Sequence, residues 1–295
     1  MSDFGRLADF MISVFVPLFL GHIVVPPLNG GLVETDVFRG NKFLENIVIL
    51  VQELFTPSEL RSSSYVREKM SLSSLRGGIS YKNFTHIFVH VSYDHMFNNL
   101  WGIFSTGYYL FEQTDASTVF IVFFASGFLA SIPFKSDLRN STTTINSTIL
   151  RKLLTEMKKI TNIDVFKEYS CGSSGAVFGL LGASTVVAIN SCVQSLRKWT
   201  QIVKIHIRGK TKKDTFEVAC LIAATTVKIY SHSGLGLIIG SIKFCTDIYM
   251  KNVDKANGVI VFDKTNHDAH FNGFLVGICF GIFYISRQKR FAKLY

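Results

Sequence analysis

Charged residues are scarce in this chain. They make up 18% of its 295 residues, and 48% of the residues are hydrophobic, whereas about 25% of the residues of a soluble domain are charged. Several nearly uncharged segments reach the length of about 20 residues that crosses a bilayer. The composition therefore argues against two soluble domains and indicates one membrane domain with sizeable loops.

Paired cysteines are also lacking. The five cysteines are isolated, with no C-x-x-C spacing, and a cysteine in an apolar segment behaves as a small hydrophobic residue. No cluster of histidine, cysteine and aspartate has the spacing of metal ligands. We therefore expect neither a disulfide framework nor a metal site.

A basic face with interleaved aromatic residues is missing too, although the formal net charge is +10. The basic residues are spread among the segments between apolar runs, so we expect no nucleic-acid partner and explain the charge by membrane topology. Residues Met1 to Phe10 carry two aspartates and one arginine. They resemble neither a transit peptide nor a signal-peptide n-region, which predicts a retained first helix.

The apolar runs predict an all-α polytopic membrane protein with six spanning helices. We expect them at residues 8–27, 86–111, 117–134, 172–192, within 216–250, and at 270–286. The stretch 43–55 is amphipathic and carries two glutamates, so we expect it to lie in the membrane interface.

The fifth span is the least defined, because segment 216–250 contains two apolar halves separated by Tyr230–Gly234. Either half can supply the crossing. The fourth and sixth spans begin with serine and histidine, and these residues meet only if the segment between the two spans crosses an odd number of times. One crossing is the economical prediction.

Basic residues predict the orientation. Segment 191–215 holds seven Lys/Arg and the chain end after Ser286 holds four, which favours a cytosolic position for both. Loop 135–171 also holds seven, but with four acidic residues. It carries sequons at Asn140 and Asn146, which belong on the lumenal side if they are used.

Three motifs carry the functional prediction. They are Gly172-Ser173-Ser174-Gly175, the segment from His90 to Asn99, and His270-Phe-Asn-Gly273-Phe-Leu-Val-Gly277. In their order along the chain, the three motifs resemble the signature of the rhomboid family of intramembrane serine proteases. The resemblance covers roughly residues 81–285 and implies a six-helix rhomboid-like bundle.

The resemblance implies a catalytic dyad of Ser174 as nucleophile and His270 as general base, with no cofactor. Serine needs a neighbouring imidazole to accept its proton, and a histidine inside an apolar span is a functional hypothesis by default. The rhomboid pattern places the nucleophile directly before Gly175, so Ser173→Ala should keep substantial activity. His267 competes with His270 but lies in a polar run that we expect to be a loop.

Supporting residues follow from spacing and from the resemblance. His95 and Asn99 are four apart, so they share one helix face, and in rhomboids the matching residues stabilise the oxyanion. Small residues recur every fourth position in the fourth and sixth helices, and this spacing allows the two helices to pack closely. Phe178 is expected near the imidazole, and His90 and His86 in structural or pocket-lining roles. The small and supporting residues expected at the site are Gly172, Gly175, Phe178, Gly273, Gly277 and His90.

Two positions depart from the family pattern. Tyr81-Lys82 stands where many rhomboids have Trp-Arg, which affects loop contacts and not the dyad. Glu112 matches a structural glutamate of the family with an irregular spacing from Asn99.

We thus expect three parts: residues 1–80 with the first helix and a long loop, the catalytic core 81–286, and a basic cytosolic tail 287–295. The expected function is cleavage of single-pass membrane proteins in the bilayer, in the secretory pathway or plasma membrane rather than in mitochondria. The alternatives are a catalytically inactive rhomboid-like protein that binds membrane clients, and a transporter or channel. Inactive members generally lack the serine or histidine, or have proline before the serine, whereas Ser173 stands there.

Overall fold

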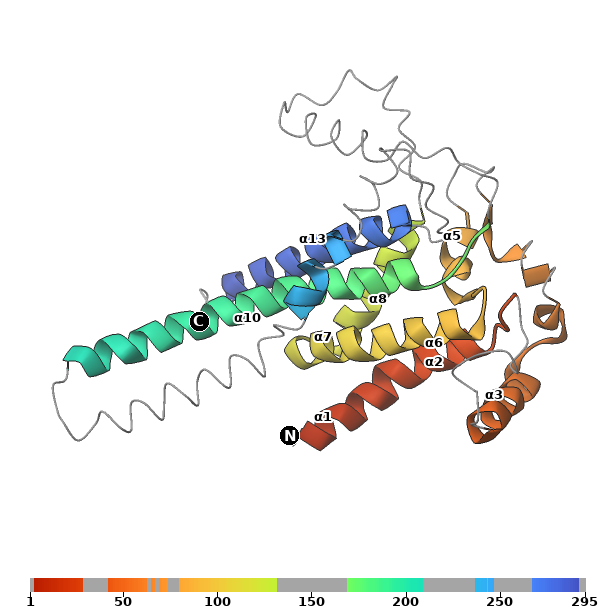
Figure 1. The fold of residues 1–295 in the computed structure, drawn as a ribbon, viewed down its shortest axis with the longest axis horizontal. Helices are drawn as coiled ribbons and strands as arrows, with labels where there is room; N and C mark the ends of the chain where they lie inside the picture. The colour runs from red at the N-terminus through yellow and green to blue at the C-terminus, as the bar shows by residue number, and fades with distance from the viewer. Residues whose placement is uncertain are drawn as a thin grey trace, which may run out of the picture.

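The computed structural model describes residues 3–28, 42–62, 65–66, 69–73, 80–131, 169–208, 237–242, 244–246 and 267–291. These parts are mostly helical (Figure 1). Within them, three helices are long and apolar enough to cross a membrane: Asp3–Ile23, Ser174–Gln201 and Ala269–Gln288. The prediction of a helical membrane protein is confirmed at this level. The count of six spans stays a prediction.

The first span is built from α1 (Asp3–Phe10), the π-helical turn η1 (Met11–Phe15) and α2 (Val16–Ile23). It begins five residues before the predicted start at residue 8 and ends before the predicted end at 27. The early end has a local cause. Proline disfavours helical backbone at the preceding residue, so Pro26 stops the helix upstream of itself.

The second span starts later than the predicted residue 86. The short helix α5 (Lys82–Thr85) and the 3-10 turn η4 (His86–Phe88) come first, and the span consists of α6 (Tyr93–Gly102), the π-helical turn η5 (Ile103–Gly107) and α7 (Tyr108–Gln113). Ser92 has extended backbone, and its hydroxyl accepts a hydrogen bond from the His95 N–H at 3.2 Å. This serine cap fixes the start of α6 at Tyr93. His86 and His90 therefore precede the helix.

Helix α8 (Ala116–Ala130) returns the chain across the bundle. Asp115 caps it, since the carboxylate accepts a hydrogen bond from the Thr118 N–H at 2.7 Å. The predicted span at 117–134 overlaps this helix. Its last residues, 132–134, and the sequons at Asn140 and Asn146 lie outside the described residues.

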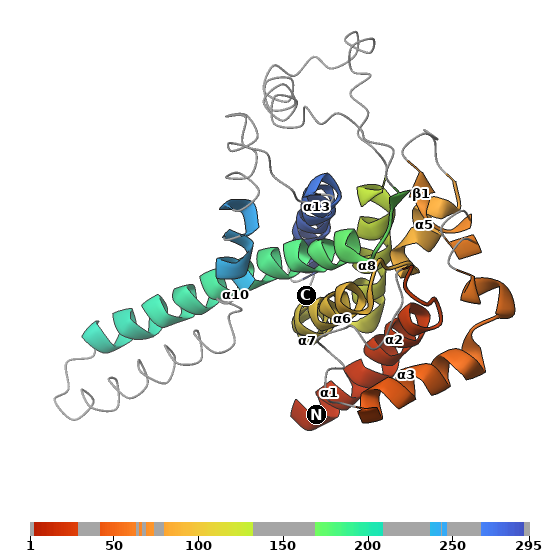
Figure 2. The same ribbon diagram turned by 45° about the vertical axis from the view of Figure 1, so that its right-hand side comes forward.

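Helices α10 (Ser174–Arg208) and α13 (His267–Phe291) lie side by side and run in the same direction, as Figure 1 shows. In Figure 2, α13 is strongly foreshortened while α10 stays extended, so the two helices cross at an angle. The prediction for the fourth span ended at residue 192, but α10 continues to Arg208. At about 1.5 Å per residue it is about 50 Å long, longer than the bilayer core of about 30 Å. Both views show its C-terminal part running beyond the other labelled helices.

Helix α13 begins at His267, so the prediction that His267 lies in a loop is wrong. Polar and acidic residues are common in the first turn of a helix, where negative charge is stabilised by the helix dipole. Polarity alone therefore does not distinguish a loop from the start of a helix.

In the region of the predicted fifth span, the structure describes the short apolar helix Leu237–Thr246, which is not among the helices long enough to cross a membrane. Ser241 and Thr185 share a hydrogen bond of 2.5 Å, and the Phe244 ring stacks on Phe178 at 4.1 Å between centroids. As the residue number rises in this segment, its partner number in α10 falls, so the segment runs antiparallel to α10. The second apolar half thus packs on α10, and residues 216–229 lie outside the described part of the chain.

Helix α3 (Lys42–Phe55) lies beside the end of the first span. Gln52 donates to the Ile23 carbonyl at 3.2 Å and accepts from the Tyr93 hydroxyl at 2.9 Å. Leu54 is 67% exposed and Phe55 is 60% exposed. A 14-residue helix spans only about 21 Å, too short to cross about 30 Å of hydrocarbon, so an interfacial position is the consistent interpretation.

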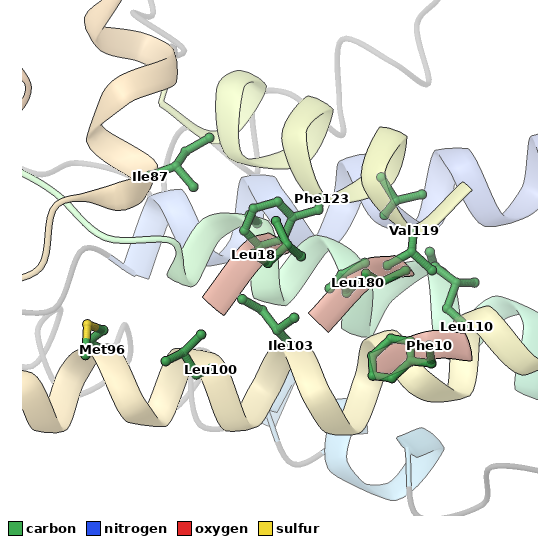
Figure 3. Packing of buried hydrophobic residues seen from close by; sticks show 14 of the residues in the cluster. Phe10, Leu18, Ile87, Met96, Leu100, Ile103, Leu110, Val119, Phe123 and Leu180 are labelled. Carbon is green, nitrogen blue, oxygen red and sulfur yellow. The ribbon is translucent and has the colours of Figure 1, made fainter. Parts of the chain in front are cut away.

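A core of large side chains joins the first span to α6, η5, α8 and α10 (Figure 3). Phe10 is fully buried and lies 5.3 Å from the Tyr108 ring, and Phe15 meets Phe104 edge to face at 5.5 Å. The two π-helical turns, η1 and η5, carry Phe15 and Phe104. Each turn widens its helix locally, and together they bring these rings into contact.

Candidate active site

The two ends of the bundle are fixed by hydrogen bonds between distant segments. At one end the Arg6 guanidinium donates to the Glu112 carbonyl at 3.0 Å, and the Tyr284 hydroxyl donates to the Gln113 carbonyl at 3.1 Å. The first residues of α1 therefore lie with the end of α7 and the C-terminal part of α13. At the other end the Gly172 N–H donates to the His86 carbonyl at 3.0 Å. The predicted functional residues gather at this second end.

The chain enters α10 through a constrained turn. Strand β2 (Tyr169–Ser170) pairs antiparallel with β1 (Leu72–Ser73), and Gly172 follows with φ +112. This left-handed backbone is accessible to glycine at little cost. The His95 ring packs against Gly172, because a Cβ placed there would lie 2.8 Å from the His95 Cε1 atom. Glycine here permits both the turn and the contact.

The two candidate serines have different surroundings. Ser173 is fully buried, and its carbonyl accepts the Val177 N–H at 2.9 Å. Ser174 is the first residue of α10 and is half-buried. The first N–H groups of a helix have no partner within that helix and point at whatever lies before its start. Ser174 thus combines some accessibility with nearby backbone donors.

Helices α10 and α13 touch through backbone atoms. A Cβ on Gly273 would collide with the Gly175 carbonyl, and a Cβ on Gly277 would collide with the Gly179 carbonyl. A Cβ on Gly175 would meet the Ala269 carbonyl at 3.4 Å. The glycines after Ser174 therefore face the glycines after His270, which is the small-residue contact expected from the spacing.

The His270 ring lies over the Phe178 ring, with 4.5 Å between centroids and an angle of 31°. Phe178 is one turn after Ser174 on α10. Phe178 also stacks against Phe244 of the segment Leu237–Thr246, and the Phe244 ring meets Phe274 at 5.5 Å. The structure thus brings His270 to the face of α10 near Ser174, backed by three aromatic rings.

Asn99 and His95 lie one turn apart on α6. Asn99 is 6% exposed, and within the described parts of the chain its Nδ2 atom is buried without a hydrogen-bond partner. A buried amide donor normally has a partner, and an unpaired one is worth a functional explanation. His95 is half-buried, and its ring borders the turn before α10, as described above.

A row of imidazole rings continues from His95 into the bundle. The His90 ring lies 5.4 Å from His95 and 5.2 Å from His22, measured between centroids. His22 comes from the first span and was not singled out from the sequence. Its signal was present, since a histidine inside an apolar helix is a functional hypothesis by default. His90 also hydrogen-bonds Ser173, with 3.3 Å between Nε2 and Oγ.

The segment around Tyr81 and Lys82, which lacks the Trp-Arg pair of many rhomboids, is held in place by the neighbouring Asn83. Tyr81 is 63% exposed, whereas Asn83 is 2% exposed. The Asn83 amide donates to the Ser131 hydroxyl at 3.0 Å, and its carbonyl oxygen accepts the Ser80 N–H at 2.7 Å. Asn83 therefore ties this segment to the end of α8.

The irregular spacing between Asn99 and Glu112 coincides with a structural irregularity. The π-helical turn η5 lies between them, and a π turn accommodates an extra residue without breaking the helix. This places Glu112 at the end of α7, beside Arg6 of the first span.

Metal-binding groups are not evident among the described residues, where no three histidine, cysteine, aspartate or glutamate side chains are arranged to hold an ion. Four cysteines in these parts form no disulfide: Cys171, Cys192, Cys245 and Cys279. Cys220 lies outside them.

Comparison with known protein families gives a match over most of the chain. The sequence model of the Rhomboid domain matches residues 78–287, which is most of the chain. This chain belongs to the rhomboid family. It is therefore an integral membrane protein of a family whose members are generally intramembrane serine proteases. Searches of curated proteins and of solved structures return no significant match.

Membership also accounts for the outward surface of this rhomboid. Large apolar side chains on its spanning helices point away from the bundle, among them Ile12 at 74%, Trp101 at 69% and Phe283 at 65% exposure. In a bilayer such side chains face lipid, which is as apolar as they are.

Proposed function

We propose that this rhomboid is an active intramembrane serine endopeptidase that uses a Ser174–His270 dyad. The observation that carries the proposal is the approach of α10 and α13 at Gly175 and Gly273. It brings the two helix starts together, and the His270 ring lies on Phe178, one turn from Ser174.

The dyad performs acyl transfer in two stages. The Ser174 hydroxyl attacks the scissile carbonyl carbon while His270 takes its proton, and His270 then returns the proton to the leaving amine. A water molecule, deprotonated by the same imidazole, hydrolyses the acyl-enzyme and restores Ser174. The stacked Phe178 ring limits the movement of the imidazole between these steps.

The oxyanion that forms in both stages needs donors that are already in place. Asn99 suits this role, because its buried Nδ2 lacks a partner in the described structure. His95 borders the turn that leads to Ser174, and the first N–H groups of α10 supply further donors. These groups support a site for developing negative charge.

The substrates of the proposed enzyme are single-pass membrane proteins whose helices unwind easily near the lumenal or outer face. These substrates reach Ser174 by moving within the bilayer. The chain therefore interacts with both its substrates and the surrounding lipid. We place the enzyme in the secretory pathway or plasma membrane.

The test is reconstitution of the purified chain in liposomes with a model single-pass substrate. The parent should cleave it, and Ser174→Ala should not. Ser184→Ala is the matched control, because Ser184 is a fully buried serine of the same helix and bonds the Thr106 carbonyl at 3.0 Å. The control should cleave. If the parent binds substrate without cleaving it, the protein belongs to the inactive client-binding class instead.

A further inference from the structure

The hydrogen bond between Ser173 and His90 has a definite direction. The His90 Nδ1 atom lies 3.3 Å from the Phe88 carbonyl, and its Nε2 atom lies 3.3 Å from the Ser173 Oγ atom. A carbonyl only accepts hydrogen bonds, so the ring proton sits on Nδ1. Nε2 then accepts, and Ser173 donates its hydroxyl proton.

The pair is sealed inside the protein. Both Ser173 and His90 are fully buried, so neither side chain touches a substrate. Ser173 precedes Ser174 and follows Gly172, so its side chain anchors the turn that sets the start of α10. His90 lies edge to face with His95, at an angle of 72°. One hydrogen bond thus holds both the turn before Ser174 and the ring behind His95.

Resting on the proposed function, we propose that Ser173 is a positioning residue, which acts through His90 to fix the His95 ring and the turn before Ser174. If the Ser173 hydroxyl is removed, His90 Nε2 becomes a buried hydrogen-bond acceptor without a donor. The ring is then free to turn or to change tautomer, and His95 loses its fixed neighbour. The proposal differs from a second nucleophile, because Ser173 has no exposed surface from which to attack.

The expected kinetic signature follows from this placement. Ser173→Ala should keep substantial cleavage but lower kcat by about fivefold, the scale of one lost hydrogen bond, and leave KM nearly unchanged. Ser184→Ala removes a buried serine hydrogen bond of the same helix, away from the histidines, and should leave kcat unchanged. An equal loss of kcat in both variants would assign the effect to general destabilisation and overturn the proposal.

A double-mutant cycle tests whether Ser173 acts through His90. His90→Phe keeps a ring of similar width and removes both nitrogens. In that background Ser173→Ala should have no further effect on kcat, because residues of one unit are non-additive. Losses that multiply would show that Ser173 acts by another route, and the inference would be wrong.

A spectroscopic measurement makes the result independent of cleavage. Ring nitrogen-15 NMR of the histidine-labelled full chain should show His90 protonated at Nδ1, with its signals identified by their absence in His90→Phe. The Nε2 signal should shift in Ser173→Ala and stay in place in Ser184→Ala. An unmoved Nε2 signal, or a proton on Nε2 in the parent, overturns the hydrogen bond and the inference with it. A parent that cleaves nothing while the Nε2 signal shifts as expected overturns the proposed function alone.

Discussion

The two sides of α10 are packed by opposite means. Toward α13 it presents Gly175, Gly179 and Gly182, and the contact is backbone against backbone. Toward the first span, residues such as Leu180 meet a cluster of large aromatic rings around Phe10. Backbone atoms cannot change rotamer, whereas rings can repack. The glycine side therefore fixes the distance between two helices, and the aromatic side fills volume.

The largest effect should come from the glycine side. Gly277→Val places a side chain against the Gly179 carbonyl, so α10 and α13 must separate or fail to pack. We expect loss of cleavage and destabilisation of about 3 kcal/mol or more, measured by unfolding in mixed micelles. Gly240→Ala is the control, since a Cβ there meets nothing within 4 Å. A stable, active Gly277→Val protein would show that the contact is not tight.

A substitution on the aromatic side should lower the stability of the protein without changing the cleavage rate of the folded molecules. Phe10→Ala removes a fully buried ring and should cost about 3 kcal/mol of unfolding free energy. Cleavage per folded molecule should stay near the parent value, because Phe10 lies near the opposite end of the bundle from Ser174. Comparing activity at 15 °C with the unfolding midpoint separates the two quantities. A selective loss of kcat would remove the distinction between the two sides.

Phe178 lies outside both the glycine contact and the Phe10 cluster, since its ring contacts His270 and Phe244. An aromatic contact contributes about 0.5–1.5 kcal/mol, so Phe178→Ala should lower kcat by about tenfold at most. Phe178→Tyr keeps the ring and should retain activity. Phe283→Ala, on the outward face of α13 at 65% exposure, serves as the control. Identical kinetics for Phe178→Ala and the parent would exclude a role of the stack in orienting His270.

The smallest effect concerns the cap at the start of α8, which takes part in neither the glycine contact nor the aromatic ring contacts. Asp115→Ala removes the cap of α8 and should cost about 1 kcal/mol. Hydrogen bonds from Ser117 and Thr118 hold the pKa of Asp115 below its usual value. The cap is thus fully present above the unfolded-state pKa and is lost as pH falls through the folded-state value. Unfolding midpoints of parent and variant should converge in acid; a constant gap would contradict the cap.

Apolar runs predicted most helices, because lipid solvation demands long uncharged segments whatever their neighbours. They predicted neither the start of α6 nor the π-helical turns. The start depends on one serine cap at Ser92, which hydropathy does not register. The turns η1 and η5 carry Phe15 and Phe104, whose ring contact joins segments far apart in the sequence, and no local apolar run contains that contact.

In the candidate site, too, local sequence patterns predicted some features and missed those that depend on contacts between distant residues. Motif order pointed to Ser174 and His270, and spacing pointed to the glycine contact. The contact between His22 and His90 joins residues far apart in the sequence, and no local pattern contains it. His267 was assigned to a loop on polarity, although a polar, acidic first turn is also how helices begin.

The dyad is tested most directly by a fluorophosphonate probe, which reacts with an activated serine, followed by mass spectrometry of the labelled peptide. We predict an adduct on Ser174 of the parent in micelles, absent in His270→Ala and retained in His267→Ala and Ser184→Ala. An adduct on Ser173, or labelling of Ser174 that persists without His270, would contradict the Ser174–His270 mechanism.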